Sequence, residues 1–272
     1  MSAAAGDECV IELADVHKGF GDHPVLRGVD LQIRAGETFT ILGGSGSGKS
    51  VCLKHMIGLL RPDRGRVEVL GRDVAHCSER ELVGLRTEVS MIFQSGALFD
   101  SLPVHENVAY PLREHRRDWS EAQIGERVAS SLESVGLFGV EQKMPSELSG
   151  GMRKRVGVAR GIALRPKVIL YDEPTTGLDP ANQRRVGELI VGLQRDLGVT
   201  SVVVTHELEL CFAISNRVAL LRKGRIEAQG SAEAMRSSEH PAVRAFLDGA
   251  RDDTPEAEME SEPERDPGEI HA

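Results

Sequence analysis

The chain has 272 residues, 40% of them hydrophobic, and a formal net charge of −9 at pH 7. No apolar run approaches the roughly 20 residues that span a bilayer, and residues 1–10 lack the basic and then apolar pattern of a secretion signal. We therefore expect the chain to stay in the cytoplasm and to reach a membrane only through a partner.

The negative charge is concentrated in residues 251–272, which hold nine acidic and two basic side chains. This composition predicts a disordered acidic tail, either solubilising or interacting. The remaining 250 residues carry 33 acidic and 31 basic side chains, and this near-neutrality argues against a large nucleic-acid-binding surface. The four cysteines lack metal-ligand spacing and are predicted to be reduced thiols packed as small hydrophobic side chains. They are Cys9, Cys52, Cys77 and Cys211.

The first predicted elements are strands on either side of a glycine-rich loop. Residues 29–34 alternate apolar and polar side chains, which predicts a half-buried strand. The apolar run 38–42 predicts a strand covered on both faces, and it leads directly into the glycine-rich loop at 43–50. Behind the loop, one face of a predicted helix carries Leu53, Met56, Ile57 and Leu60. The turn at 61–65 ends this helix before a further strand.

Residues 98–165 differ from the rest because helical spacing dominates in them. Helices are predicted at 120–137 and 150–164, and runs of β-branched residues are few. This region therefore predicts a helical insertion in an otherwise alternating chain.

Strands return after the helical region. They are predicted at 167–174 and 200–207, followed by a hairpin at 217–230 that turns at Lys223-Gly224 and by a short helix at 240–249. Alternating strands and helices interrupted by a helical block indicate an α/β fold with a parallel-sheet core and an inserted helical subdomain.

The loop "GGSGSGKS" matches the phosphate-binding pattern G-x-x-x-x-G-K-[ST]. Glycines let successive N–H groups turn toward an anion, and the following helix start adds partial positive charge. We expect Lys49 to reach the β- and γ-phosphates of a nucleotide and the Ser50 hydroxyl to bind Mg²⁺. The predicted cradle comprises Gly43, Gly44, Ser45, Gly46, Ser47, Gly48, Lys49 and Ser50.

Other candidate residues follow apolar runs. Asp172 suits the surroundings of Mg²⁺, and Glu173 suits the polarisation of an attacking water. His206 is either a γ-phosphate or water contact or an ordinary strand-end residue. Gln94 is either a sensor of nucleotide state or a loop residue, and Phe20 either stacks on an adenine ring or packs in the core.

The order of these motifs, together with "LSGG" at 148–151 and "GLD" at 177–179, resembles the ATP-binding-cassette (ABC) transporter ATPases over residues 10–230. The resemblance implies a homodimer that holds ATP and Mg²⁺ between its copies. Ser149, Gly150 and Gly151 would meet the partner's γ-phosphate, Asp179 would lie where the chain crosses between the two sites, and Gln94 would join Ser50 and Asp172 at Mg²⁺. Met152 replaces the family's usual glutamine, which puts a polar contact in doubt.

The fold implied by this resemblance is a P-loop NTPase (RecA-like) core with an N-terminal antiparallel β subdomain and an inserted α-helical subdomain. We expect the ABC domain at residues 8–250, its helical subdomain at 98–165 and a C-terminal extension at 231–250. The acidic tail at 251–272 would follow this domain.

Residues 91–115 and 144–155 are similar to Mla-type phospholipid-transport ATPases, although "TTGLDP" departs from their pattern. The resemblance implies a motor at the cytoplasmic face of the inner membrane that moves phospholipids between inner and outer membranes. Its partners would be an integral-membrane permease (MlaE-like), an Mce-domain protein (MlaD-like) and, as an optional third, a STAS-domain protein (MlaB-like).

Alternatives within transporters are a toluene-tolerance or other Mce-associated ATPase, or an amino-acid or lipoprotein system. Non-transport cassettes fit less well. Chromosome clamps insert long coiled coils, whereas only 97 residues without sustained heptads separate Ser50 from Leu148. Ribosome-acting cassettes carry two cassettes in one chain. Glu173 and His206 argue against a scaffold without turnover.

Overall fold

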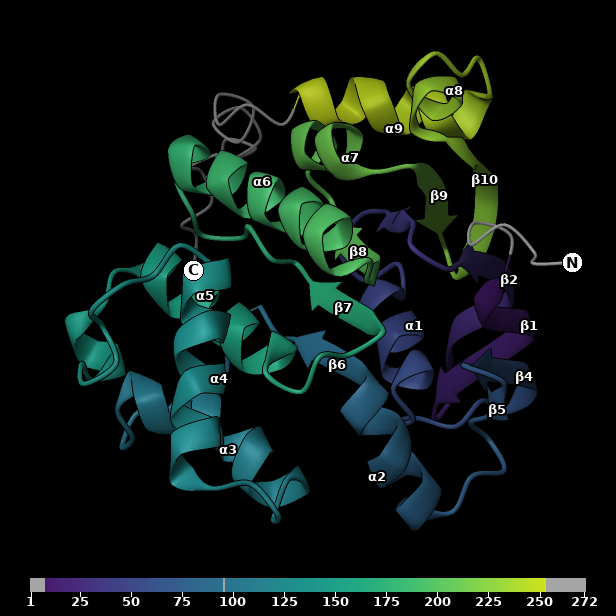
Figure 1. Cartoon of the computed structure of the whole chain (residues 1–272). Helices are drawn as coiled ribbons and strands as arrows, with labels where there is room; N and C mark the ends of the chain where they lie inside the picture. The colour runs from purple at the N-terminus through teal and green to yellow at the C-terminus, as the bar shows by residue number, and fades with distance from the viewer. Residues whose placement is uncertain (1–7, 95, 253–272) are drawn as a thin grey trace, which may run out of the picture.

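The structure contains two β-sheets of different kinds, a larger one near the centre and a smaller one at one edge of the molecule (Figure 1). The computed structural model describes residues 8–94 and 96–252. The smaller sheet is antiparallel, in the order β2 (His23–Arg34), β1 (Cys9–Phe20), β4 (Arg64–Val69) and β5 (Arg72–Asp73). The larger sheet has the order β10 (Arg225–Ser231), β9 (Arg217–Arg222), β3 (Thr38–Leu42), β8 (Thr200–Thr205), β7 (Val168–Asp172) and β6 (Val89–Ile92). All its pairs are parallel except β10 with β9.

The helices form three groups around the larger sheet (Figure 1). Beside the antiparallel sheet lie α1 (Lys49–Met56) and α2 (Glu79–Glu88). The helical group on the opposite side comprises α3 (Val104–His115), α4 (Glu121–Ser134), the 3₁₀ turn η1 (Pro145–Glu147) and α5 (Gly150–Ile162). The remaining helices are α6 (Pro180–Leu197), α7 (Leu208–Ile214), α8 (Ala232–Arg236) and α9 (Pro241–Asp252).

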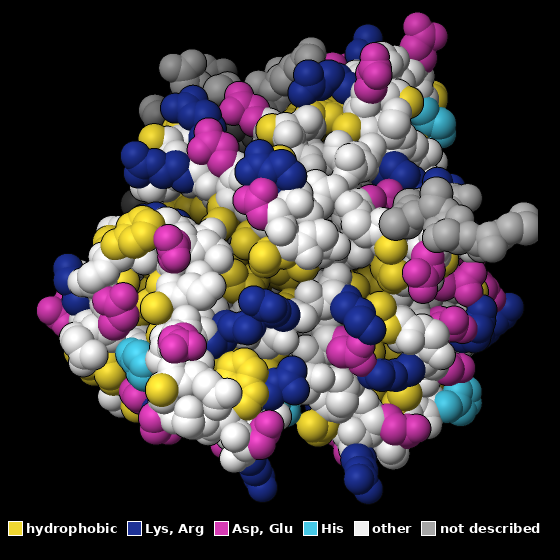
Figure 2. Space-filling model, in the orientation of Figure 1, with side chains coloured by type: hydrophobic (Ala, Val, Ile, Leu, Met, Phe, Trp, Pro, Cys, Tyr) yellow, Lys and Arg dark blue, Asp and Glu magenta, His cyan; other side chains and the backbone are white. Residues whose placement is uncertain are grey.

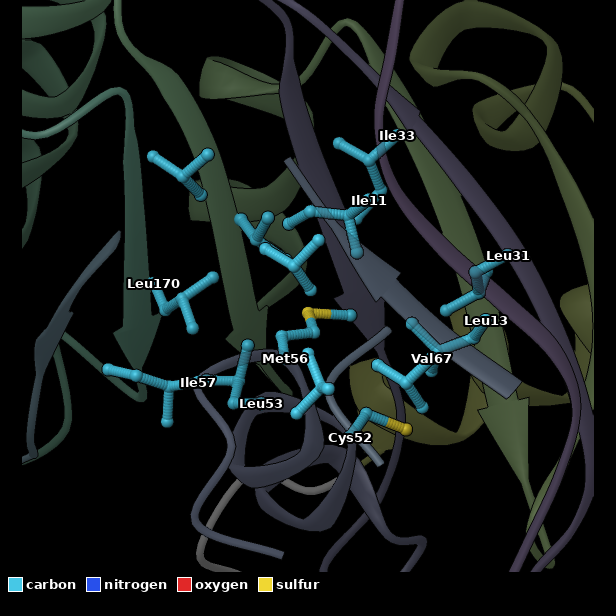
Figure 3. Close-up of a cluster of buried hydrophobic side chains, with 14 of the residues drawn as sticks. Ile11, Leu13, Leu31, Ile33, Cys52, Leu53, Met56, Ile57, Val67 and Leu170 are labelled. Carbon is cyan, nitrogen blue, oxygen red and sulfur yellow. The ribbon is translucent and has the colours of Figure 1, made fainter. Parts of the chain in front are cut away.

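Both faces of the larger sheet are buried, so its inner strands are apolar without alternation. Side chains such as Phe39 and Leu170 belong to one core, which also contains side chains of α1 and the antiparallel sheet (Figure 3). Tyr171 and Val203 belong to a second core, which includes side chains of α3–α6. Successive strand residues point to opposite faces, which explains how neighbours such as Leu170 and Tyr171 enter different cores.

The N-terminal antiparallel sheet, the parallel core and the inserted helices confirm the predicted fold class. The hairpin turn at Lys223-Gly224 is also confirmed, and both residues have positive φ, as the two-residue turns that match strand twist require. The predicted helical face behind the loop is wrong at Leu60, because α1 ends at Met56 and Gly58 follows with φ +68°.

Some elements differ from the sequence-based expectations. β2 begins six residues before the predicted strand, and α2 and α6 were not predicted individually. Helix α9 continues to Asp252, beyond the predicted end at 249. The proposed domain boundaries remain predictions. The disordered tail was predicted to start at residue 251, which is wrong for residues 251–252 because they belong to α9, and residues 253–272 lie outside the described residues.

The four cysteines are all free thiols. Cys52, Cys77 and Cys211 are buried, as predicted, and burial raises the pKa of Cys52 to about 12. Cys9 is exposed, so the prediction that it packs as a hydrophobic side chain is wrong. Within residues 8–94 and 96–252, no helix combines the length and apolar character needed to cross a membrane.

Leu13→Ala should lower the free energy of unfolding by about 2–5 kcal/mol, because Leu13 is 1% exposed and its removal leaves a cavity between the antiparallel sheet and α1. Leu59→Ala is the matched control. Leu59 is 49% exposed, and its loss should change stability by no more than about 0.5 kcal/mol. Urea unfolding of both variants checks this, and equal losses would contradict the assignment of the core.

Candidate functional site

The glycine-rich loop connects the end of β3 to the start of α1. Gly43 donates its N–H to the Thr205 carbonyl at 3.3 Å. A Cβ at Gly43 would lie 2.4 Å from the Leu221 carbonyl oxygen. Gly48 caps α1 with φ +107°, a conformation that favours glycine. These two glycines therefore hold the ends of the loop close to the sheet.

The middle of the loop borders open space. A Cβ added at Gly44 or Gly46 would meet no heavy atom within 4 Å. The buried hydroxyl of Ser47 has no hydrogen-bond partner. Open space beside a glycine backbone and a helix start is what a phosphate group requires. The loop thus fits the predicted phosphate cradle.

Lys49 is buried beneath this loop, with 7% of its side chain exposed. Its ammonium donates hydrogen bonds to the carbonyls of Gly43 at 2.8 Å and Gly44 at 3.0 Å. It also lies 3.4 Å from Glu173 Oε1. One cation thereby joins the loop after β3 to the carboxylate after β7.

The three residues predicted to bind Mg²⁺ lie near the phosphate loop. The Ser50 hydroxyl donates to Asp172 Oδ1 at 2.7 Å, and Gln94 borders the same cleft from the end of β6. Hydroxyl, carboxylate and amide oxygens suit Mg²⁺, which usually takes few protein ligands together with water and substrate phosphates. Within the described residues there is no cluster of three or more His, Cys, Asp or Glu that could hold a metal ion.

Glu173 has the geometry of a strained functional residue. Its φ is +48°, which is uncommon outside glycine and costs about 1–3 kcal/mol. Its Oε2 lies 3.0 Å from His206 Nδ1, while Oε1 faces Lys49. A carboxylate between an ammonium and an imidazole, at the rim of a phosphate cradle, can orient and polarise a water.

Eight of the predicted site residues line one cleft of about 1500 Å³. It is lined by Gly44, Ser45, Gly46, Lys49, Ser50, Gln94, Glu173 and His206, among others. A groove of about 350 Å³ between α4, α5 and α6 contains none of the predicted residues. Figure 2 shows hydrophobic side chains gathered in a hollow below α6. The larger cleft is therefore the candidate site.

Several predicted residues lie outside the lining of this cleft. Phe20 ends β1 and is 48% exposed, with the Lys18 ammonium 5.8 Å from its ring centre. Ser149 is exposed and caps α5, accepting the Met152 N–H at 3.2 Å. Gly150 and Gly151 begin that helix in the helical group. The signature turn, Ser149–Gly151, is thus not among the residues that line the cleft at the chain's own phosphate loop.

Asp179 and Met152 have local roles. Asp179 caps α6 by accepting the N–H groups of Ala181 and Asn182, both at 3.0 Å. The bond from the Asn182 N–H is the main cause that lowers the pKa of Asp179. Met152 packs against the second core, where glutamine would place an amide.

Sequence reasoning missed part of the site. Glu207 accepts hydrogen bonds from Thr175 Oγ1 at 2.8 Å and Gln183 Nε2 at 3.4 Å. The cleft also continues along α7–α9, where Arg236 stacks over Phe212 at 4.9 Å. Only the position of Glu207, directly after His206, could have indicated its place from the sequence.

Comparison with known proteins gives a consistent result. The family model described as ABC transporter matches residues 26–176. A probable ribonucleotide transport ATP-binding protein of Mycobacterium leprae is 41% identical over 92% of this chain and 74% of its own length. The intermembrane phospholipid transport ATP-binding protein MlaF of Escherichia coli is 40% identical, covering 89% of this chain and 90% of MlaF.

The chain is also similar to a protein named for a different substrate and to a solved dimeric cassette. The methionine import ATP-binding protein MetN of Caulobacter vibrioides is 42% identical over 90% of this chain and 74% of its own length. A dimeric ATP-binding cassette solved in a post-hydrolysis state with ADP and Pi superposes with a TM-score of 0.75. It has 31% identity and covers 82% of this chain and 98% of that one.

Gly43→Ala and Gly44→Ala should separate folding from binding. The Gly43 methyl group would collide with backbone and cost about 1–3 kcal/mol of stability. Gly44→Ala should change stability by no more than about 0.5 kcal/mol, because its methyl group meets no protein atom. It should nevertheless weaken ATP binding, since that methyl group enters the space predicted for phosphate.

Chemical denaturation and calorimetric titration with ATP measure the two effects. Gly84→Ala serves as the control, because Gly84 is an exposed position in α2 with open space around it. Unchanged ATP affinity in Gly44→Ala would contradict the proposed phosphate cradle.

Proposed function

This chain belongs to the ABC transporter family and is an ATPase, and we propose that two copies of it drive a transporter that moves phospholipids between membranes. The proposal rests on residues 91–115, which include Gln94 and whose sequence resembles the Mla-type ATPases. We propose that the surface beside Gln94 faces a permease. The MlaF relative supports the same cargo.

The position of the signature turn supports a two-copy site. The N–H groups at the start of α5 favour an anion, but this turn does not line the chain's own cleft. A second copy placed head to tail would supply a γ-phosphate to each signature turn. The dimeric solved relative is consistent with this arrangement.

Within each site, the chain's residues have separable roles. Lys49 would exchange its contacts with the loop carbonyls for phosphate oxygens, and Ser50, Asp172 and Gln94 would hold Mg²⁺, whose charge would offset that of the phosphates. Glu173 orients and polarises the attacking water, and His206 fixes the carboxylate through Oε2. Phe20 is proposed to stack on the adenine from the end of β1.

The surface beside Gln94 is suited to a membrane partner. Phe99 and Tyr110 pack against each other with ring centres 4.9 Å apart, yet they remain 42% and 46% exposed. Asn107 is fully buried and holds the intervening loop by accepting the Phe99 N–H at 2.8 Å and donating to the carbonyls of Phe99 and Leu102. A rigid exposed aromatic pair is a favourable anchor for a partner helix.

The cargo assignment depends on which permease binds this surface. MlaF, the mycobacterial relative and MetN have similar identities to this chain, and their names specify phospholipid, ribonucleotide and methionine. Residues 91–115, which include the aromatic pair Phe99 and Tyr110, favour the phospholipid system through their sequence resemblance to the Mla-type ATPases. An MlaE-like permease, an MlaD-like Mce protein and an optional MlaB-like partner complete the proposed assembly at the cytoplasmic face of the inner membrane.

Glu173→Gln should retain ATP but lower its hydrolysis by about 10²–10⁴-fold, because the amide cannot polarise the attacking water. The variant should accumulate as an ATP-bound dimer. Phosphate release and size-exclusion chromatography with light scattering measure these effects. Glu133→Gln makes the same charge change on α4, away from the cleft, and should behave as wild type. Turnover of Glu173→Gln near the wild-type rate would contradict the role of Glu173.

Changing both Phe99 and Tyr110 to Ser should lower recovery of the permease at least about tenfold, since the aromatic anchors are lost. The measurement is affinity purification of the native complex in mild detergent, with proteomic and lipid analysis. Phe138→Ser is the control, because Phe138 is 71% exposed but belongs to the α4–η1 connection. Co-purified phospholipid with an Mce protein supports the proposal, whereas a methionine- or ribonucleotide-binding partner would refute the lipid cargo.

A further inference from the structure

Lys154 connects the helical group to the segment that follows the proposed catalytic carboxylate. It lies in α5, five residues after Ser149. Its ammonium donates to the Pro174 carbonyl at 2.9 Å and to the Thr176 carbonyl at 2.7 Å. These carbonyls belong to the turn 174–176, directly after Glu173. Lys154 therefore joins the helix that begins at the signature turn to the turn that carries the base.

The environment of Lys154 differs from that of an ordinary surface lysine. Partial burial lowers its pKa, and the nearby carboxylates of Glu207 and Glu173 oppose this effect. Main-chain carbonyls replace part of the water shell that the ammonium loses. Partial burial of the Lys154 ammonium costs free energy unless the two carbonyls stay in position to accept its hydrogen bonds. The contact is therefore specific to one arrangement of the turn.

The turn 174–176 also forms side-chain contacts with Glu207 and with the proposed catalytic residue Glu173. Thr175 Oγ1 donates to Glu207 at 2.8 Å, and Thr176 Oγ1 lies 3.4 Å from Glu173 Oε2. Glu207 directly follows His206, which contacts the same Glu173 oxygen. A displacement of the carbonyls held by Lys154 would therefore change the position of Glu173 relative to His206.

Helix α5 also contacts the Gln94 segment. Arg160 donates to the Gly96 carbonyl at 3.0 Å and the Ala97 carbonyl at 2.8 Å. A Cβ at Gly157 would lie 3.0 Å from the Gly96 carbonyl oxygen, which indicates close packing of this helix on the loop. Helix α5 therefore begins at the signature turn and contacts the turn after Glu173 through Lys154. Near its end, it contacts the proposed permease-facing segment through Arg160.

We propose that Lys154 is a positioning residue that couples the two ATP sites of the dimer. This inference rests on the two-copy arrangement proposed above. The signature turn of one chain contacts the nucleotide of the opposite site, which sets the position of α5. Through Lys154, the position of α5 then sets the position of turn 174–176, and so of Glu173, in the chain's own site. Binding at one site thereby prepares the base at the other.

The test compares full-length wild type with Lys154→Met, which removes the donors and keeps a long side chain, and Lys154→Arg, which keeps a cation. Lys143→Met is the control, because Lys143 is an exposed lysine in the helical group region. ATPase rates against ATP concentration give kcat, KM and the Hill coefficient. Hydrogen–deuterium exchange of peptides covering 173–179 reports on the turn without nucleotide.

In Lys154→Met we expect kcat to fall about 10- to 100-fold, since small displacements of a catalytic group have effects of that size. The Hill coefficient should fall from above 1 to about 1 as coupling is lost. Exchange in residues 173–179 should increase. Lys154→Arg should restore at least part of the Hill coefficient, and Lys143→Met should match wild type in every measurement.

Three results would overturn the inference in distinguishable ways. If wild type dimerises with ATP but Lys154→Met shows an unchanged Hill coefficient or unchanged exchange, the role of Lys154 is refuted and the two-copy function is not. A wild-type chain that hydrolyses ATP without dimerising would refute the two-copy function, and the coupling with it. Loss of kcat with the wild-type Hill coefficient would assign Lys154 a merely structural role.

Discussion

The parallel pairing of β3, β8 and β7 is the constraint on which the site depends. Leu42 pairs with Thr205, and Asp172 pairs with Val204, so these strands end at the same edge of the sheet. The phosphate loop, the two carboxylates and His206 each follow one of these ends. Because the strands are buried on both faces, a change of register would displace hydrophobic side chains from two cores at once.

A second constraint acts through α5, which packs the helical group onto this edge. Glycines at 151, 157 and 161 allow close approach, since a Cβ at Gly151 would meet Asn182 at 3.1 Å and one at Gly161 would meet Ile92 at 2.4 Å. Asn182 is in turn bound to Asp179, the cap of α6. The signature turn, the Gln94 segment and the start of α6 therefore contact one helix. That geometry is suited to relating nucleotide state to the position of a membrane partner.

The fold class and the phosphate loop could be predicted from the sequence because they depend on local patterns. Strand periodicity and glycine spacing are properties of short segments, and the hairpin at Lys223-Gly224 follows from two residues that adopt positive φ. The end of α1 was misplaced because Leu60 continues the apolar spacing, although Gly58 terminates the helix. The bonds of Lys154 and Glu207 could not be predicted, because their partners become neighbours only after β7, β8 and α5 have packed together.

The energetic demand on the proposed dimer is compatible with these contacts. Moving an equilibrium from 1:99 to 99:1 requires about 5.5 kcal/mol of differential binding. Two sites share this demand, so each must supply roughly 2.7 kcal/mol, and a hydrogen bond to a charged group contributes about 1.5–3 kcal/mol. The exposed Ser149 hydroxyl and the first N–H groups of α5 offer more than one such bond to a γ-phosphate. In the proposed dimer, loss of that phosphate would remove these bonds from both sites, and the free energy lost would be enough to reopen the pair and to displace α5.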